Sequence, residues 1–176
     1  MNHFTKLFAI FLVFIQIQIA LSQSLEQKVC QQNRYKALCF STLNNNPRSK
    51  TSNLHGLASI AFDATIKTFN DMEQFLIIVL NLVSRSEDSK KYRSCVEDYG
   101  AAINNILPAV VADLKAKKYP EAMSQMKEVL VKQGDCDKQF AGPDTSAKKT
   151  ELMSFTKVVH DTADMTIDII KMLSTN

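Results

Sequence analysis

Three long stripes of apolar residues recur at alternating steps of three and four positions, with four threonines among them, and they constrain the fold of this chain most strongly. Such spacing keeps one face of an α-helix apolar. The stripes predict three long helices, and their members are Leu54, Ala58, Ala61, Thr65, Thr68, Met72, Phe75, Val79 and Leu82; Tyr92, Val96, Tyr99, Ile103, Ile106, Val110 and Leu114; and Leu152, Phe155, Val159, Thr162, Thr166, Ile169 and Leu173.

A shorter helix is predicted from Pro120 to about Lys132, because proline is well tolerated at the first helical position. Four helices joined by short polar links favour an all-α fold, an antiparallel up-and-down four-helix bundle. With only 4 Gly and 4 Pro in 176 residues, a many-turned β-sandwich or barrel is disfavoured. Pro108 should kink or locally open the second helix.

Two segments depart from the simple pattern. The apolar run Phe75–Leu80 could be a strand on local preference alone, but the helical register continues on both sides, so we expect a helix. Since this run is apolar all round, it must be covered on more than one face or expose an apolar patch. Residues 135–147, with Gly142 and Pro143 as breakers, are expected to be irregular.

Residues 1–22 have the order of a secretory signal peptide: a short charged start, the apolar run Leu7–Ile15, and small residues before a cut after Ser22. Gln16 and Gln18 interrupt the apolar run too early for a transmembrane helix, which needs about 20 apolar residues. We therefore expect a secreted domain over 23–176 with no membrane association after cleavage. The destination is extracellular, with the vacuole as the alternative.

Four cysteines follow the leader, namely Cys30, Cys39, Cys95 and Cys136. An even count in a secreted chain favours two disulfides, and the spacing alone leaves all three pairings open. A zinc site is disfavoured because no C-x-x-C or H-x-x-x-H spacing is present. Cys30 and Cys39 would lie about 13.5 Å apart in one straight helix, so a bond between them would require the chain to fold back.

The charge and motif content argue against several classes of function. A net charge of +3 gives no polyanion signature, so we expect no nucleic-acid partner. His55, His160 and Asp161 lack an accompanying G-x-S-x-G elbow or zincin motif. We therefore expect no enzyme activity, no catalytic residues, no metal and no cofactor.

Several motifs together resemble the plant invertase and pectin methylesterase inhibitor family, over nearly all of the chain behind the leader. They are V-C-x8-C-F-x-x-L from Val29 and N-P-R-S from Asn46, followed by a long Ala-rich helix that opens at Leu54. C-x3-Y from Cys95, C-x3-F from Cys136 and a final apolar helix complete the pattern.

The resemblance implies the pairing Cys30–Cys39 and Cys95–Cys136, an N-terminal helical hairpin over 23–50 and a bundle over 51–176. It also implies an inhibitor that docks one to one onto a cell-wall or vacuolar enzyme, either acid invertase or pectin methylesterase. The alternative is a secreted helical bundle that acts as a signalling ligand or binds an apolar ligand, which the Phe75–Leu80 run keeps open.

The partner-binding candidates are Lys115, Lys117, Lys118 and Tyr119. Invertase inhibitors resemble one another in a Pro-Lys-Phe tripeptide at the tip between two bundle helices; here Lys118 matches the lysine and Tyr119 keeps an aromatic ring, but Lys117 replaces the proline. Val159-His160-Asp161 resembles a second motif of that branch. The competing interpretation is that these lysines only complement a helix dipole.

Overall fold

The computed structural model describes residues 8, 12, 23–84, 87–142 and 147–175, and every regular element in them is helical. The expected signal peptide, apart from two isolated residues, lies outside the described residues. In chain order, the elements are α2 (Leu25–Gln32), α3 (Lys36–Asn44), η1 (Pro47–Thr51), α4 (Leu54–Leu82), α5 (Ser89–Ala101), η2 (Ala102–Ile106), α6 (Leu107–Lys115), α7 (Tyr119–Gln139) and α8 (Ala147–Ser174).

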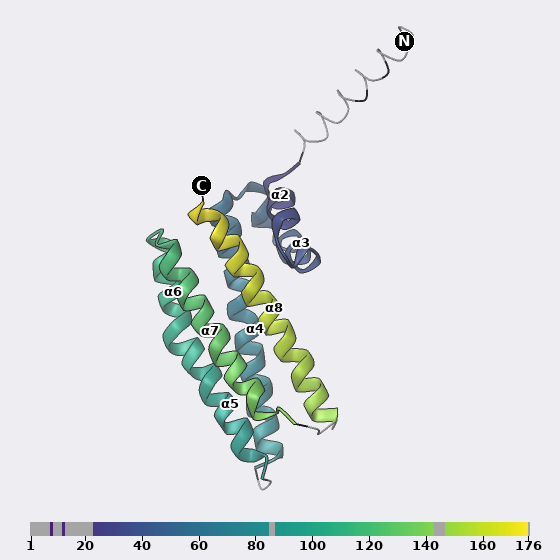
Figure 1. The fold of residues 1–176 in the computed structure, drawn as a ribbon, viewed down its shortest axis with the longest axis vertical. Coiled ribbons are helices and arrows are strands. Elements are labelled where there is room, and N and C mark those ends of the chain that lie inside the picture. The colour runs from purple at the N-terminus through teal and green to yellow at the C-terminus, as the bar shows by residue number, and fades with distance from the viewer. Residues whose placement is uncertain (1–7, 9–11, 13–22, 85–86, 143–146, 176) are drawn as a thin grey trace.

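The predicted antiparallel four-helix bundle is confirmed (Figure 1). Helix α4 packs between α8 and α5, and α7 packs between α8 and the continuous segment α5–η2–α6. The apolar stripes explain this arrangement, because each turns its buried side chains toward the shared axis. The largest fully buried side chains are Leu43, Leu57, Phe69, Met72, Leu76, Tyr99, Val110, Met126, Leu152, Met165, Ile169 and Ile170.

Threonines in two of the stripes satisfy their hydroxyls inside the core. The Thr166 hydroxyl donates to the Ala61 carbonyl across the α4–α8 contact at 3.0 Å, and it lies 2.9 Å from the Thr65 hydroxyl. A buried hydroxyl without such a partner would cost about 1–3 kcal/mol. These hydrogen bonds fix the register of α4 against α8.

The Phe75–Leu80 run is helical, as expected from its register. Leu76 and Val79 face the core, while the ring of Phe75 packs against Phe155 of α8 with centroids 5.6 Å apart. Ile78 is 60% exposed, so the outward side of this run is a surface patch. None of the pockets described below is lined by this run.

Helix α7 is longer than predicted, and the expectation of an irregular segment over 135–147 was wrong for 135–139, which belong to α7, and for Ala147, which begins α8. The buried stripe of α7 continues through Gln133 and Cys136, and Phe140 packs its ring on Tyr92 with centroids 4.8 Å apart. A buried glutamine interrupts the apolar pattern at Gln133, which is why the pattern alone ended the helix too early. Residues 143–146 lie outside the described residues.

The predicted break near Pro108 takes the form of a π-helical turn. Residues Ala102–Ile106 form this turn directly before α6, whose first turn contains the proline. Proline has no N–H to donate and crowds the carbonyl four residues earlier, so the helix widens there. This turn separates α5 from α6 and changes how each of them meets α4.

The N-terminal hairpin is present, with α2 and α3 joined by the Cys30–Cys39 disulfide at a Cα–Cα distance of 5.4 Å. The chain reverses at residues 33–35 between the two helices, in agreement with the fold-back that such a bond requires. The second disulfide joins Cys95 of α5 to Cys136 at a Cα–Cα distance of 4.7 Å. Because Cys136 lies within α7, this bond links two bundle helices rather than a helix and a loop.

The reversal of the hairpin is also where it attaches to α8. The Asn33 side chain donates a buried hydrogen bond to the Met165 carbonyl at 2.9 Å. The guanidinium of Arg34 binds the carboxylates of both Asp164 and Asp168, each at 2.8 Å. These contacts hold the hairpin against the end of the bundle where α8 terminates (Figure 1).

Candidate docking site

The four candidate residues gather on the short connection between α6 and α7. Helix α6 ends at Lys115 and α7 begins at Tyr119, so Lys117 and Lys118 form the turn between them. This turn lies at the same end of the bundle as the start of α4 and the end of α8 (Figure 1). The structure therefore places all four residues on one end of the molecule, which we call the tip.

Two backbone hydrogen bonds close the end of α6 and shape the tip. The Lys118 amide donates to the Asp113 carbonyl at 2.8 Å, and the Lys117 amide donates to the Leu114 carbonyl at 3.0 Å. This pair of bonds is the Schellman arrangement, in which one residue takes the left-handed conformation. Lys117 occupies that position with a φ of 58°. Since glycine is usual there, the lysine adopts a conformation that costs about 1 kcal/mol.

The lysines of the tip are exposed cations. Lys115, Lys117 and Lys118 are all exposed, and none forms an ion pair within the described part of the chain. Asp113 and Glu121 lie on the flanking turns without pairing to them. Free ammonium groups on a turn held by hydrogen bonds can make charge-assisted hydrogen bonds to carboxylates with little loss of backbone freedom.

Tyr119 is half-buried at the base of the tip. Its ring packs against His55 in the first turn of α4, with ring centroids 6.3 Å apart. The Nδ1 atom of His55 is buried without a hydrogen-bond partner in the described residues. Tyr119 therefore joins the tip to α4 and offers only part of its ring surface to a partner.

The backbone at position 117 also differs from the invertase-branch tripeptide. Proline fixes φ near −65° and has no amide hydrogen. Lys117 has a positive φ, and its amide donates the hydrogen bond that closes α6. A proline at this position is therefore incompatible with the observed turn on both counts.

The second motif considered above lies elsewhere. His160 and Asp161 are on α8, where Asp161 forms an ion pair with Lys157. Burial raises the pKa of Asp137, a residue of α7 that lies close enough to His160 for an electrostatic interaction. Gln133 donates a hydrogen bond to the Asp137 carboxylate. Asp137 lies about 27 Å along α7 from the tip at 1.5 Å per residue. The structure does not bring this polar group together with the lysines.

The described residues show neither a metal-binding group nor a membrane-spanning helix. Within the described ranges, the His, Cys, Asp and Glu side chains form no group of three that could hold a metal ion. No helix in those ranges combines the length and apolar character needed to cross a bilayer. The tip offers cations and an aromatic edge, which are suited to binding.

Comparison with known proteins identifies relatives over most of the chain. A pectinesterase inhibitor from Actinidia deliciosa is 23% identical over 116 residues, which are 66% of this chain and 62% of that protein. This chain thus matches less than two thirds of the relative's length.

Solved structures extend the likeness to the fold. A mutant form of a pectin methylesterase inhibitor from Arabidopsis superposes with a TM-score of 0.68 at 18% identity, covering 85% of this chain and 97% of that one. A second pectin methylesterase inhibitor structure, from Arabidopsis thaliana, gives 0.62 at 18% identity over 84% and 94%. The profile of the plant invertase/pectin methylesterase inhibitor family matches residues 24–171, the hairpin and nearly all of the bundle, and the chain belongs to that family.

Proposed function

We propose that this chain is a secreted inhibitor of pectin methylesterase, which docks one to one onto the enzyme and blocks its active site. The family match over residues 24–171 carries this proposal. The relative from Actinidia deliciosa and the two Arabidopsis structures are pectinesterase or pectin methylesterase inhibitors by name. Inhibition by docking requires an interface of about 1,600 Å² and no chemistry by the inhibitor itself.

The tip geometry supports a docking role and favours pectin methylesterase over acid invertase as the target. The ammonium groups of Lys115, Lys117 and Lys118 have no ion-pair partner among the described residues and can meet carboxylates in an enzyme cleft. The dipole interpretation applies only to Lys115, because Lys117 and Lys118 lie beyond the last turn of α6. The proline of the invertase-branch tripeptide cannot be accommodated at Lys117.

Secretion is part of the proposal. Residues 1–22 would direct the chain out of the cell and be removed after Ser22. The mature domain would span 23–176, with the hairpin over 23–50 and the bundle over 51–176. Disulfides form and persist in extracellular compartments, and the structure holds two of them. The apoplast is the destination that this reasoning favours.

A paired inhibition titration tests the proposal. The mature, oxidised protein is titrated against pectin methylesterase and against acid invertase between pH 4 and 7. We expect stoichiometric loss of pectin methylesterase activity and unchanged invertase activity. Inhibition of invertase alone would reassign the target. Absence of any effect on either enzyme at micromolar excess would refute an inhibitory role.

A charge reversal then tests the tip. Lys118→Glu replaces an attractive contact with a repulsive one, so the inhibition constant for pectin methylesterase should rise by about tenfold or more. Lys127→Glu is the matched control, because Lys127 is an exposed lysine of α7 outside the tip and the change in net charge is the same. Equal inhibition constants for the two variants would show that the tip carries no recognition.

A further inference from the structure

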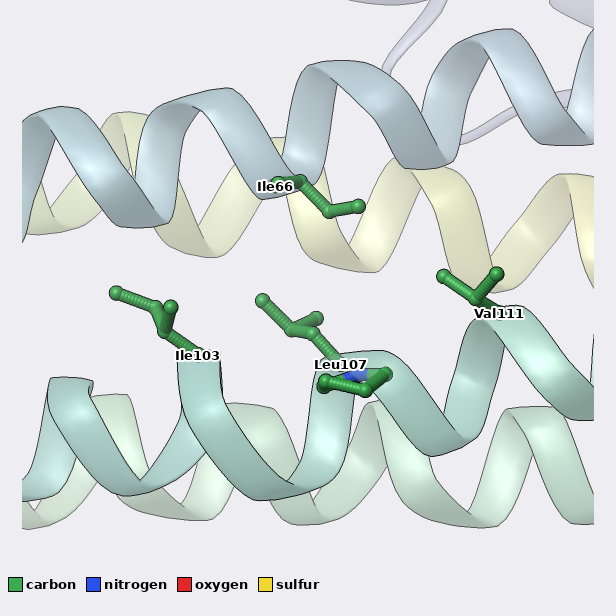
Figure 2. Close-up of a pocket in the computed structure, with 5 residues that line it drawn as sticks. Ile66, Ile103, Leu107 and Val111 are labelled. Carbon is green, nitrogen blue, oxygen red and sulfur yellow. The ribbon is translucent and has the colours of Figure 1, made fainter.

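An apolar groove runs between α4 and the segment η2–α6. It has a volume of about 330 Å³, and its walls are Ile66, Ile103, Leu107, Pro108 and Val111. Figure 2 shows Ile66 of α4 opposite Ile103 and Leu107 across this groove. A smaller hollow of about 130 Å³ continues toward the tip and is lined by His55, Ser59, Phe62, Asp63, Val111, Leu114 and Lys115. Val111 lines both, so they form one surface, the α4–α6 groove.

The groove has a structural cause in the sequence. Helix α4 packs closely along α5 and reaches η2, but its backbone makes little close approach to α6. The π-helical turn at Ala102–Ile106 and Pro108 separate the two halves of this segment. Because α6 starts from a widened turn, it diverges from α4 and leaves Ile66, Ile103 and Val111 only partly buried.

The α6 wall changes character along its length. Ile103, Leu107, Val111 and Lys115 follow one another at steps of four, so they share one face of the helical segment. They span about 18 Å at 1.5 Å per residue. Three apolar side chains are followed by a cation at the end that adjoins the tip.

The α4 wall of the groove also changes from apolar to polar toward the tip. Ile66 lies at the apolar end, and His55 lies at the tip end beside Tyr119. The one carboxylate among the lining residues, that of Asp63, is paired with Arg48 of η1 at 2.8 Å. The outer end of the groove therefore presents Lys115, whose positive charge is paired with no carboxylate in the part of the chain that the structure describes.

We propose that the α4–α6 groove binds an extended loop of the target enzyme, with an apolar side chain at the Ile103 end and a carboxylate at the Lys115 end. This inference rests on the proposed inhibitory function. The length of the groove accommodates about five residues of extended chain. Continuity with the basic tip places the loop in the same interface as Lys117 and Lys118.

A protein segment fits this groove better than a small apolar ligand does. The inner part offers no polar side chain that could orient a small molecule, and small-molecule sites ordinarily combine enclosure with a few polar groups. A loop held by the rest of an interface needs no such group, because its neighbours fix its position. An apolar side chain of the loop would fill the groove as interface anchors do.

Substitutions at Val111 test the groove by inhibition of pectin methylesterase, with thermal unfolding by circular dichroism measured in parallel. Val111→Glu places a charge against the apolar side chain, and the spacing of four residues to Lys115 favours an ion pair that neutralises that cation. We expect its inhibition constant to rise about tenfold or more. Val111→Ala removes two methyl groups from a side chain that is already half-buried in the free protein, so only part of their burial is lost and the inhibition constant should rise about threefold. Ile78→Glu, at a 60% exposed position on the same α4 that carries Ile66, is the control and should leave inhibition unchanged.

The outcomes separate this inference from the proposed function. If the wild-type protein inhibits the enzyme and Val111→Glu inhibits equally well, the groove assignment is wrong and the inhibitory function stands. If Val111→Glu fails to fold, an unchanged inhibition constant for Val111→Ala overturns the assignment in the same way. A wild-type protein without inhibitory activity refutes the proposed function and the groove assignment with it.

Two other occupants give distinct results. If a second copy of this chain occupies the groove, light scattering will show a wild-type dimer that Val111→Glu dissociates. If a small apolar ligand occupies it, the wild-type protein will bind 1-anilinonaphthalene-8-sulfonate, Val111→Glu will not, and inhibition will be the same for both. Either result overturns the assignment to a loop of the enzyme.

Discussion

Because Lys117 has a left-handed backbone conformation, we expect two substitutions at this position, to glycine and to proline, to change the stability of the protein in opposite directions. Lys117→Gly keeps the turn and removes the steric cost of a side chain at a φ of 58°. Lys117→Pro installs the residue that the invertase branch carries there, but the pyrrolidine ring cannot adopt a positive φ. It also removes the amide that donates to the Leu114 carbonyl at 3.0 Å. The same turn should therefore become more stable with glycine and less stable with proline.

The expected magnitudes follow from these two changes. Relief of the left-handed strain should raise the free energy of unfolding by about 1 kcal/mol for Lys117→Gly. Lys117→Pro should lower it by about 3 kcal/mol, the usual cost of a proline that breaks a hydrogen-bonded helical position. In a domain of this size, 1 kcal/mol corresponds to about 2–4 °C in Tm. Glycine should then raise Tm by about 2–4 °C, and proline should lower it by about 6–12 °C.

Thermal unfolding of the oxidised mature protein, followed by circular dichroism, measures both changes. Lys117→Ala is the control, because alanine removes the charge but keeps the side-chain strain, so its Tm should match the wild type. A Tm for Lys117→Pro equal to or above that of the wild type would show that the turn is not the one described. Lys117→Pro should also fail to gain inhibition of acid invertase, since it disrupts the tip instead of completing the tripeptide.

Three further predictions concern the scaffold. Replacing Cys95 and Cys136 together by serine should lower the free energy of unfolding, measured by urea denaturation, by about 3.9 kcal/mol in the loop-entropy model. A loss below about 1 kcal/mol would contradict the idea that this disulfide stabilises the fold by restricting the unfolded chain. Asn33→Ala should cost about 1–3 kcal/mol in the same assay, because the buried hydrogen bond to the Met165 carbonyl is lost and the Tyr35 amide loses its acceptor, and an unchanged midpoint would show that the hairpin is held by other contacts. Burial raises the pKa of Asp137, so the folded state binds a proton on this carboxyl group more tightly than the unfolded chain does. The buried negative charge therefore destabilises the folded state increasingly as the pH rises through the folded-state pKa. Asp137→Asn should therefore raise Tm more at pH 7 than at pH 4, and an equal rise at both values would rule out this cause.

Local pattern predicted the secondary structure well because helix formation depends on residues three and four positions apart. The stripes through Met72, Val110 and Ile169 identified three helices of the bundle from spacing alone, and Pro108 located the break between α5 and α6. The same reasoning ended α7 at about Lys132, because Gln133 looks polar in the sequence although it is buried in the folded chain. The resemblance to a family motif also suggested the tip residues as a docking site, and that assignment stays a prediction.

Tertiary structure decided what depends on residues far apart in the chain. Spacing left three cysteine pairings open, and it was the antiparallel packing of α5 on α7 that brought Cys95 to Cys136. The hairpin is held by Asn33 and Arg34 on α8, more than a hundred residues away, and no local pattern encodes such a contact. The positive φ of Lys117 and the groove beside Val111 arise in the same way, since each depends on how one helix leaves another. The sequence by itself determined which segments are helical, because that choice is local, whereas the folded chain determined which surfaces those helices expose.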